Sequence, residues 1–186
     1  MKNYYLITKE ATKYWKKALK NDRVMIACKE NTIYIVNGFN AFKMPAYVPI
    51  WDELARPAFM TECPEEGAAI EFFRGEKKPG CAQNVIDIFT KVTGDTTPAK
   101  RSPFTVDAND GLTMRLYTNA NGSVSGINSV YDAMVDPSQV EEIYCGGRYS
   151  PVILKNEHFT ALIMPVRMAD NFSEKARETF GKLLEV

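Results

Sequence analysis

The chain has 186 residues, of which 45% are hydrophobic and 25% are charged, so it can bury a core in one domain or in two small ones. Its 23 lysine and arginine residues balance its 23 aspartate and glutamate residues, which leaves no net charge to draw it onto nucleic acid or an anionic membrane. The N-terminus lacks the apolar run of a secretion signal, and no stretch of about eighteen apolar residues occurs. We therefore expect a cytoplasmic protein that has no membrane segment.

The cysteines and the histidine do not form a metal-binding pattern. Cys28, Cys63, Cys81 and Cys145 are far apart and have no CxxC spacing, and His158 is the only histidine. The chain also lacks the glycine-rich motifs that hold nucleotide phosphates. We expect reduced thiols, no metal site and no cofactor.

The first predicted element is an amphipathic helix from Thr8 to Asn21, with Thr8 as its cap. Its opposite face gathers five positive charges at helical spacing: Lys9, Lys13, Lys16, Lys17 and Lys20. This stripe is the strongest local charge feature of the chain, although lysines also form ordinary solvated helix faces that bind nothing.

Three short strands that form a meander follow the helix: 24–28, 32–36 and 39–44. Prolines recur from Pro45 to Pro79, so we expect irregular structure there, broken by one strand at 68–73. A second helix is predicted from Cys81 to Val92, with its apolar residues facing inward.

The second half of the chain predicts more strands and two helices. The expected strands are 104–106, 112–118, 123–125, 140–145, 151–154 and 159–166. A short helix at 128–135 is expected to turn Ser129, Asp132 and Asp136 outward, and an amphipathic helix from Ser173 to Leu184 ends the chain.

A weak internal repeat, a helix followed by three strands, appears at 8–44 and again at 128–166. It predicts an α+β fold in which helices pack on one face of antiparallel sheet, with a C-terminal helix added. Residues 1–168 would form one domain with an insertion at 45–110, or two short domains, and residues 169–186 would form the C-terminal helix.

Three segments of the second half resemble the closing domain of bacterial DNA polymerase III β sliding clamps. They are NSVYDAM (Asn128 to Met134), VEEIYCGG (140–147) and SPVILKNEHFTALIMPVRM (Ser150 to Met168). The most specific part is the run from Ala161 to Met168, a strand that ends in a Met-Pro-x-Arg sequence followed by an apolar residue. The resemblance implies a DNA-clamp-like fold.

In that family the final strand and its Met-Pro segment line a hydrophobic pocket for short peptides of polymerases and other partners. Carried over by position, the pocket residues would be Leu162, Met164, Pro165 and Arg167. Clamps of this family also line their ring with basic helices that contact DNA phosphates without reading base sequence, so the resemblance makes the lysine stripe of residues 8–21 a candidate site for double-stranded DNA. It implies a non-enzymatic protein of DNA replication or its control, which binds a replication protein, or DNA without sequence specificity, as a monomer or an oligomer. The C-terminal helix could cover the pocket with Phe180 or Leu184.

A cysteine and the histidine suggest an alternative function. Cys81 lies at the predicted N-terminus of a helix, where backbone N–H groups and the helix dipole favour a thiolate, and His158 opens a later strand. Papain-like and cell-wall cysteine peptidases have this order, although no flanking motif of theirs is complete here. A cysteine-dependent hydrolase is therefore the second hypothesis, beside binding without catalysis.

Overall fold

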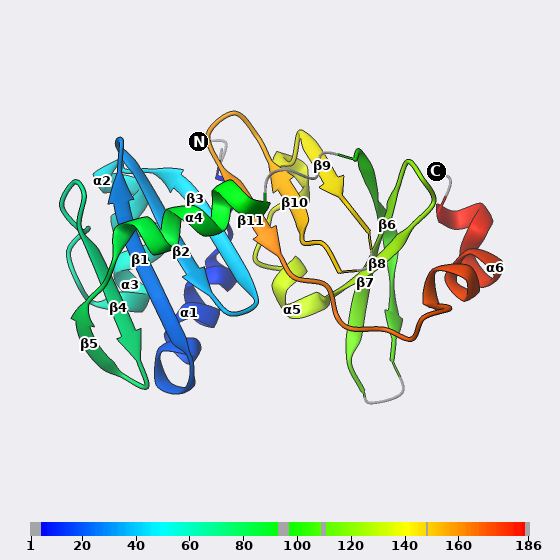
Figure 1. Ribbon diagram of the computed structural model, residues 1–186, viewed down its shortest axis with the longest axis horizontal. Helices are drawn as coiled ribbons and strands as arrows, with labels where there is room; N and C mark the ends of the chain where they lie inside the picture. The colour runs from blue at the N-terminus through cyan, green and yellow to red at the C-terminus, as the bar shows by residue number, and fades with distance from the viewer. Residues whose placement is uncertain (1–4, 93–96, 109–110, 148, 185–186) are drawn as a thin grey trace.

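The computed structural model describes residues 5–92, 97–108, 111–147 and 149–184 and consists of two antiparallel sheets that lie side by side (Figure 1). The larger sheet has eight strands in the order β5 (Glu76–Pro79), β4 (Ala69–Phe73), β1 (Arg23–Lys29), β2 (Thr32–Asn37), β3 (Asn40–Pro45), β11 (Thr160–Ile163), β10 (Val152–Lys155) and β9 (Glu142–Cys145). The smaller sheet has the order β6 (Ala99–Asp107), β7 (Thr113–Asn119) and β8 (Val124–Asn128). The predicted α+β class with antiparallel sheets and a C-terminal helix is confirmed.

Helix α1 (Lys9–Asn21) packs on one face of the larger sheet. The hydroxyl of Thr8 caps it by accepting a hydrogen bond from the backbone N–H of Glu10 at 3.2 Å, as the sequence predicts. Trp15, which has no exposed surface, lies edge-on to Phe42 and stacks on Phe59. The tryptophan therefore joins α1, the sheet and the segment after β3 in one core.

Residues 48–59 are helical, which contradicts the expectation of irregular structure there. They form α2 (Val48–Ile50), the π-helical turn η1 (Trp51–Ala55) and α3 (Arg56–Phe59). Pro49 lies in the first turn of α2, where a missing backbone N–H removes no helical hydrogen bond, and Pro57 directly follows the π-helical turn at the start of α3. Trp51 and Leu54 are buried against α1 and the sheet, so this segment is part of the core.

Helix α4 (Ala82–Val92) packs on the face of the larger sheet opposite to α1 and crosses in front of β1, β2 and β3 in Figure 1. Its buried Val85 and Phe89 belong to one hydrophobic cluster with Ala27 of β1 and Val36 of β2. The sequence pattern placed the helices on one face, whereas the structure has helices on both faces of this sheet.

Two meanders, β1 to β3 and β9 to β11, meet edge to edge in the larger sheet. Strands β3 and β11 pair antiparallel, with Ala41 opposite Leu162 and Phe42 opposite Ala161. This pairing joins segments that are about 120 residues apart in the chain and gives a continuous sheet surface. The division into domains, including an insertion at 45–110, stays a prediction.

The short helix α5 (Ser129–Asp132) differs from its predicted orientation. Asp132 was expected to face outward, but it is 6% exposed and forms ion pairs with Arg101 of β6 and Arg115 of β7. The hydroxyl of Tyr117 also donates a hydrogen bond to Asp132 at 2.6 Å. Three donors on the smaller sheet therefore draw this carboxylate inward, a contact that helical periodicity alone does not reveal.

The short helix η2 (Pro137–Gln139) and the C-terminal helix α6 (Phe172–Leu184) complete the fold. Helix α6 packs on the smaller sheet, where Phe180 lies 5.2 Å from Phe104 between ring centroids and Ala176 is buried. Within the described residues, no helix has both the length and the apolar character needed to cross a membrane.

Candidate functional site

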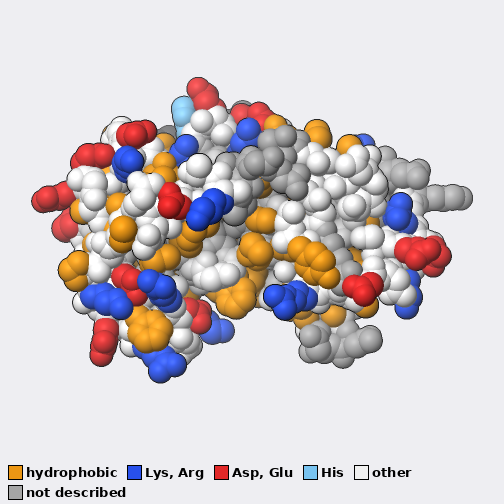
Figure 2. All heavy atoms as spheres, in the orientation of Figure 1, with side chains coloured by type: hydrophobic (Ala, Val, Ile, Leu, Met, Phe, Trp, Pro, Cys, Tyr) orange, Lys and Arg blue, Asp and Glu red, His pale blue; other side chains and the backbone are white. Residues whose placement is uncertain are grey.

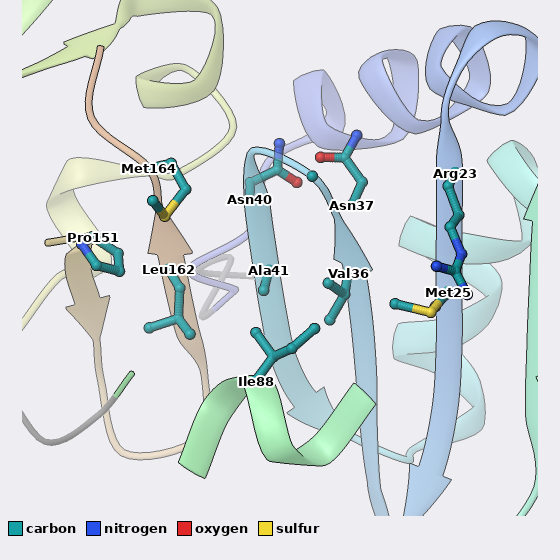
Figure 3. A pocket seen from close by; sticks show the side chains of 11 residues that line it. Arg23, Met25, Val36, Asn37, Asn40, Ala41, Ile88, Pro151, Leu162 and Met164 are labelled. Atoms are coloured by element: carbon teal, nitrogen blue, oxygen red, sulfur yellow. The ribbon is translucent and has the colours of Figure 1, made fainter. Parts of the chain in front are cut away.

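An apolar groove lies on the face of the larger sheet that α4 covers in part (Figure 3). Its floor is one row of side chains from four adjacent strands: Met25 of β1, Val36 of β2, Ala41 of β3 and Leu162 of β11. Each of these residues is the register partner of the next, so the row runs straight across the strands. Three strand spacings of about 4.8 Å make the row about 14 Å long.

The walls of the groove come from α4 and from the ends of the strands. Ile88 reaches from α4 toward Val36 and Ala41 in Figure 3, while Met164 and Pro151 close the end near β10. Met164 is 41% exposed, whereas Leu162 is buried, so the methionine forms an outer lip and the leucine forms the floor. The cavity has a volume of about 310 Å³, which is at the small end of the range for ligand pockets.

Hydrophobic side chains also gather around a hollow near the centre of this face of the molecule (Figure 2). An apolar concave surface of this kind is typical of a site that binds an apolar ligand.

The four pocket residues that the sequence resemblance implied do not all lie at the groove. Leu162 and Met164 line the groove, but Pro165 and Arg167 are not among the residues that line it. After β11 the chain turns toward the smaller sheet, because the N–H of Met164 bonds to the carbonyl oxygen of Phe39 and that of Val166 to Gly126. Pro165 is half-buried on this crossing segment and Arg167 is exposed.

The C-terminal helix does not close the groove with Phe180. The ring of Phe180 packs on Phe104 of the smaller sheet, at the far end of the molecule from α4 (Figure 1), so Phe180 does not cover the groove. The side chain of Leu184 lies outside the described residues. Among the described residues of α6, none lines the groove.

Sequence reasoning missed the half of the groove that comes from the N-terminal part of the chain. Met25 and Val36 belong to strands that were predicted, and Arg23 directly precedes the first of them. Their position beside Leu162 depends on the β3–β11 pairing. The alternation of side chains along β1 and β2 indicates which residues share a face. Nothing in the local pattern indicates which distant strand lies beside β3.

One end of the groove adjoins a charged cluster of Arg23, Glu71 and Lys78. Arg23 is the single charged residue among the described residues that line it. Its guanidinium donates to Glu71 at 2.8 Å, and the ammonium group of Lys78 contacts the same carboxylate at 3.1 Å. The hydrogen bond from Arg23 lowers the pKa of Glu71, with a further contribution from Lys78, and the same bond raises the pKa of Arg23.

The five lysines of the predicted DNA-binding stripe lie on α1, on the other side of the sheet from the groove. All five are exposed: Lys9, Lys13, Lys16, Lys17 and Lys20. Among the described residues, Lys13 alone of the five has an acidic partner, Glu10 of the same helix. The stripe is thus available to solvent, and its role in binding DNA stays a prediction.

Cys81 and His158 of the hydrolase hypothesis are far apart. Gly80, next to Cys81, bonds to Ala69 of β4, while His158 lies two residues before Thr160 of β11. Ala69 and Thr160 belong to one register row with three strands between them, so four spacings separate them by about 19 Å. Both side chains are exposed and do not form a catalytic pair.

Comparisons with known proteins found no matching family model and no matching curated protein. Two solved structures are similar to 89% of the chain. One, from Eubacterium rectale, is assigned as a DNA polymerase III beta subunit (11% identity, TM-score 0.36), and the other is a DnaN sliding clamp from Bartonella birtlesii bound to griselimycin (14% identity, TM-score 0.32). The chain spans 65% and 62% of their lengths, which is less than two thirds of either.

Proposed function

We propose that this chain is a non-enzymatic, clamp-like binding protein that takes a short apolar peptide of a replication protein into the groove of Met25, Val36, Ala41 and Leu162. The observation that carries the proposal is this straight row of apolar side chains across four strands. A connection with replication rests on the resemblance of residues 161–168 to the final strand of bacterial sliding clamps.

The dimensions of the groove favour a peptide over a larger ligand. An extended chain rises about 3.3 Å per residue, so a row of about 14 Å matches four or five residues. Side chains on one side of such a peptide are about 6.6 Å apart, which lets alternate residues reach the floor. The strands below already pair with one another, so apolar side chains and not added backbone bonds would supply the affinity.

The test is binding of fluorescein-labelled, eight-residue peptides with leucine at alternate positions, followed by fluorescence polarisation. Met164→Glu places a charge on the lip of the groove and should weaken binding at least tenfold. Met60→Glu is the matched control, because Met60 is an 83% exposed methionine that does not line the groove. Binding that is absent, or that both variants weaken equally, would refute the proposal.

A second candidate function is contact with double-stranded DNA through α1. It is favoured by the exposure of all five lysines on the helix face that points away from the sheet. The test is the affinity for a 30-base-pair duplex at several salt concentrations, combined with light scattering to measure the mass of the complex. A monomer that ignores the duplex at low salt would exclude this function.

A further inference from the structure

The charged residue at one end of the groove indicates which charge its ligand has. Arg23 precedes Met25 by two residues on β1, so both side chains leave the strand on the same face. Figure 3 shows the side chain of Arg23 running along β1 until its guanidinium lies beside Met25. Among the described residues that line the groove, Arg23 is therefore a cationic donor at the β1 end. Glu71, the register partner of Met25, continues the row at this end and forms an ion pair with Arg23.

The charges around Arg23 are not balanced within the protein. Glu71 is one carboxylate with two cationic partners, Arg23 and Lys78. The start of β1 and the β4–β5 hairpin carry more basic than acidic side chains: Arg23, Arg74, Lys77 and Lys78 against Asp22, Glu71 and Glu76. The groove itself adds no acidic residue, since Arg23 is its single charged lining residue among those described.

Arg23 has donors left for a ligand. Its contact with Glu71 uses one terminal nitrogen, whereas a guanidinium has five N–H donors in a planar fork. Its side chain is 56% exposed, so the remaining donors are open to solvent, and Glu71 would keep Lys78 as a partner if Arg23 turned toward a ligand. A carboxylate is the group that this fork binds best in two-point contact.

We propose that the ligand of the groove is a peptide segment in which an acidic residue directly adjoins the apolar residues, with its carboxylate bound to Arg23. This inference rests on the proposed function and names the specificity of the same site. Because the guanidinium of Arg23 lies beside Met25 at the β1 end of the row, the acidic residue belongs at the end of the peptide that covers Met25.

The experiment compares two pairs of capped peptides on the full chain by isothermal titration. Each pair has Leu-Ala-Leu flanked by aspartate or by asparagine, in one pair before the leucines and in the other after them. In at least one pair, the aspartate peptide should bind about tenfold more tightly than its asparagine counterpart. In the Arg23→Gln variant that ratio should fall to about one, because Lys78 still neutralises Glu71 and the fold is kept.

Arg74→Gln is the matched control, because Arg74 is an exposed arginine of the same hairpin that does not line the groove. It should leave the aspartate-to-asparagine ratio unchanged. If peptides bind, and Met164→Glu weakens them, but the ratio is near one or survives Arg23→Gln, the inference on Arg23 is wrong while the groove stands. If no peptide binds the unaltered chain, both proposals fail together.

Discussion

Replacing Asp132 with alanine should remove the central acceptor of a buried polar cluster and destabilise the protein by about 3 kcal/mol. The carboxylate is 6% exposed, pairs with Arg101 at 2.5 Å and Arg115 at 3.3 Å, and accepts a hydrogen bond from buried Tyr117. Breaking a buried ion pair by removing one partner costs about 3–5 kcal/mol, because the other charge stays buried. The lower end applies because the two arginine side chains are 24% and 16% exposed.

Urea denaturation followed by circular dichroism measures this change. A loss of about 3 kcal/mol corresponds to a fall of about 6–12 °C in the midpoint of thermal unfolding for a chain of this size. The matched control is Asp52→Ala, because Asp52 pairs with Arg56 at 3.0 Å on the surface, where an ion pair contributes about 1 kcal/mol or less.

The location of the damage is a second readout of the same substitution. Arg101 lies on β6, and Arg115 and Tyr117 lie on β7, so the cluster attaches α5 to the smaller sheet. Hydrogen exchange should therefore speed up first in β6, β7 and β8, before the larger sheet is affected. If Asp132→Ala lowers the stability by less than about 1 kcal/mol, as Asp52→Ala should, the idea that this cluster holds α5 on the smaller sheet is refuted.

Three further predictions follow from the charges and thiols described above. If α1 contacts five phosphates, the logarithm of the DNA affinity should fall with a slope of about −4.5 against the logarithm of salt concentration, and Lys16→Glu with Lys17→Glu should abolish binding while Lys43→Glu does not. Because the pKa of Glu71 is lowered on folding, its carboxylate stabilises the protein at neutral pH, and this contribution should disappear as pH falls below about 4.3. In Glu71→Gln, the urea concentration at the midpoint of unfolding should therefore depend less on pH in the acid range. Cys81→Ser should leave the thermal midpoint unchanged, and any hydrolytic activity that this substitution removes would revive the hydrolase hypothesis.

The spacing of residues in the sequence correctly predicted the helices and turns that form from interactions within a short segment. The helical spacing of Trp15 with its neighbours, and the cap at Thr8, indicated α1 to within a residue of its ends. The predicted strands 24–28 and 32–36 leave a short gap, and Glu30 and Asn31 form a turn in it, where both residues have positive φ. Such features are set by chain segments of a few residues, which is why one sequence is enough to locate them.

The failures share a different cause, since each depends on a contact between distant segments. Prolines in 48–59 suggested irregular structure, yet Pro49 and Pro57 begin helices that Trp51 and Leu54 anchor in the core. Asp132 was placed outward because its arginine partners lie on strands that precede it by 17 and 31 residues.

The candidate site follows the same rule. Leu162 and Met164 were identified through the likeness of their strand to a family sequence, while Arg23 and Met25 were not identified at all. A one-residue change in the β3–β11 register would turn Leu162 to the opposite face and remove the groove. The site is therefore a property of strand pairing, which no short motif encodes.

The two proposed binding surfaces use opposite faces of one sheet, and this arrangement makes their relation testable. The lysines of α1 lie on one side, whereas the groove beside α4 lies on the other, and no residue belongs to both. If both proposals hold, a groove peptide should bind with the same affinity, within about twofold, whether or not a saturating DNA duplex is present. Competition would mean that the two ligands share a surface, and a gain in affinity would mean that the central strands couple the two faces.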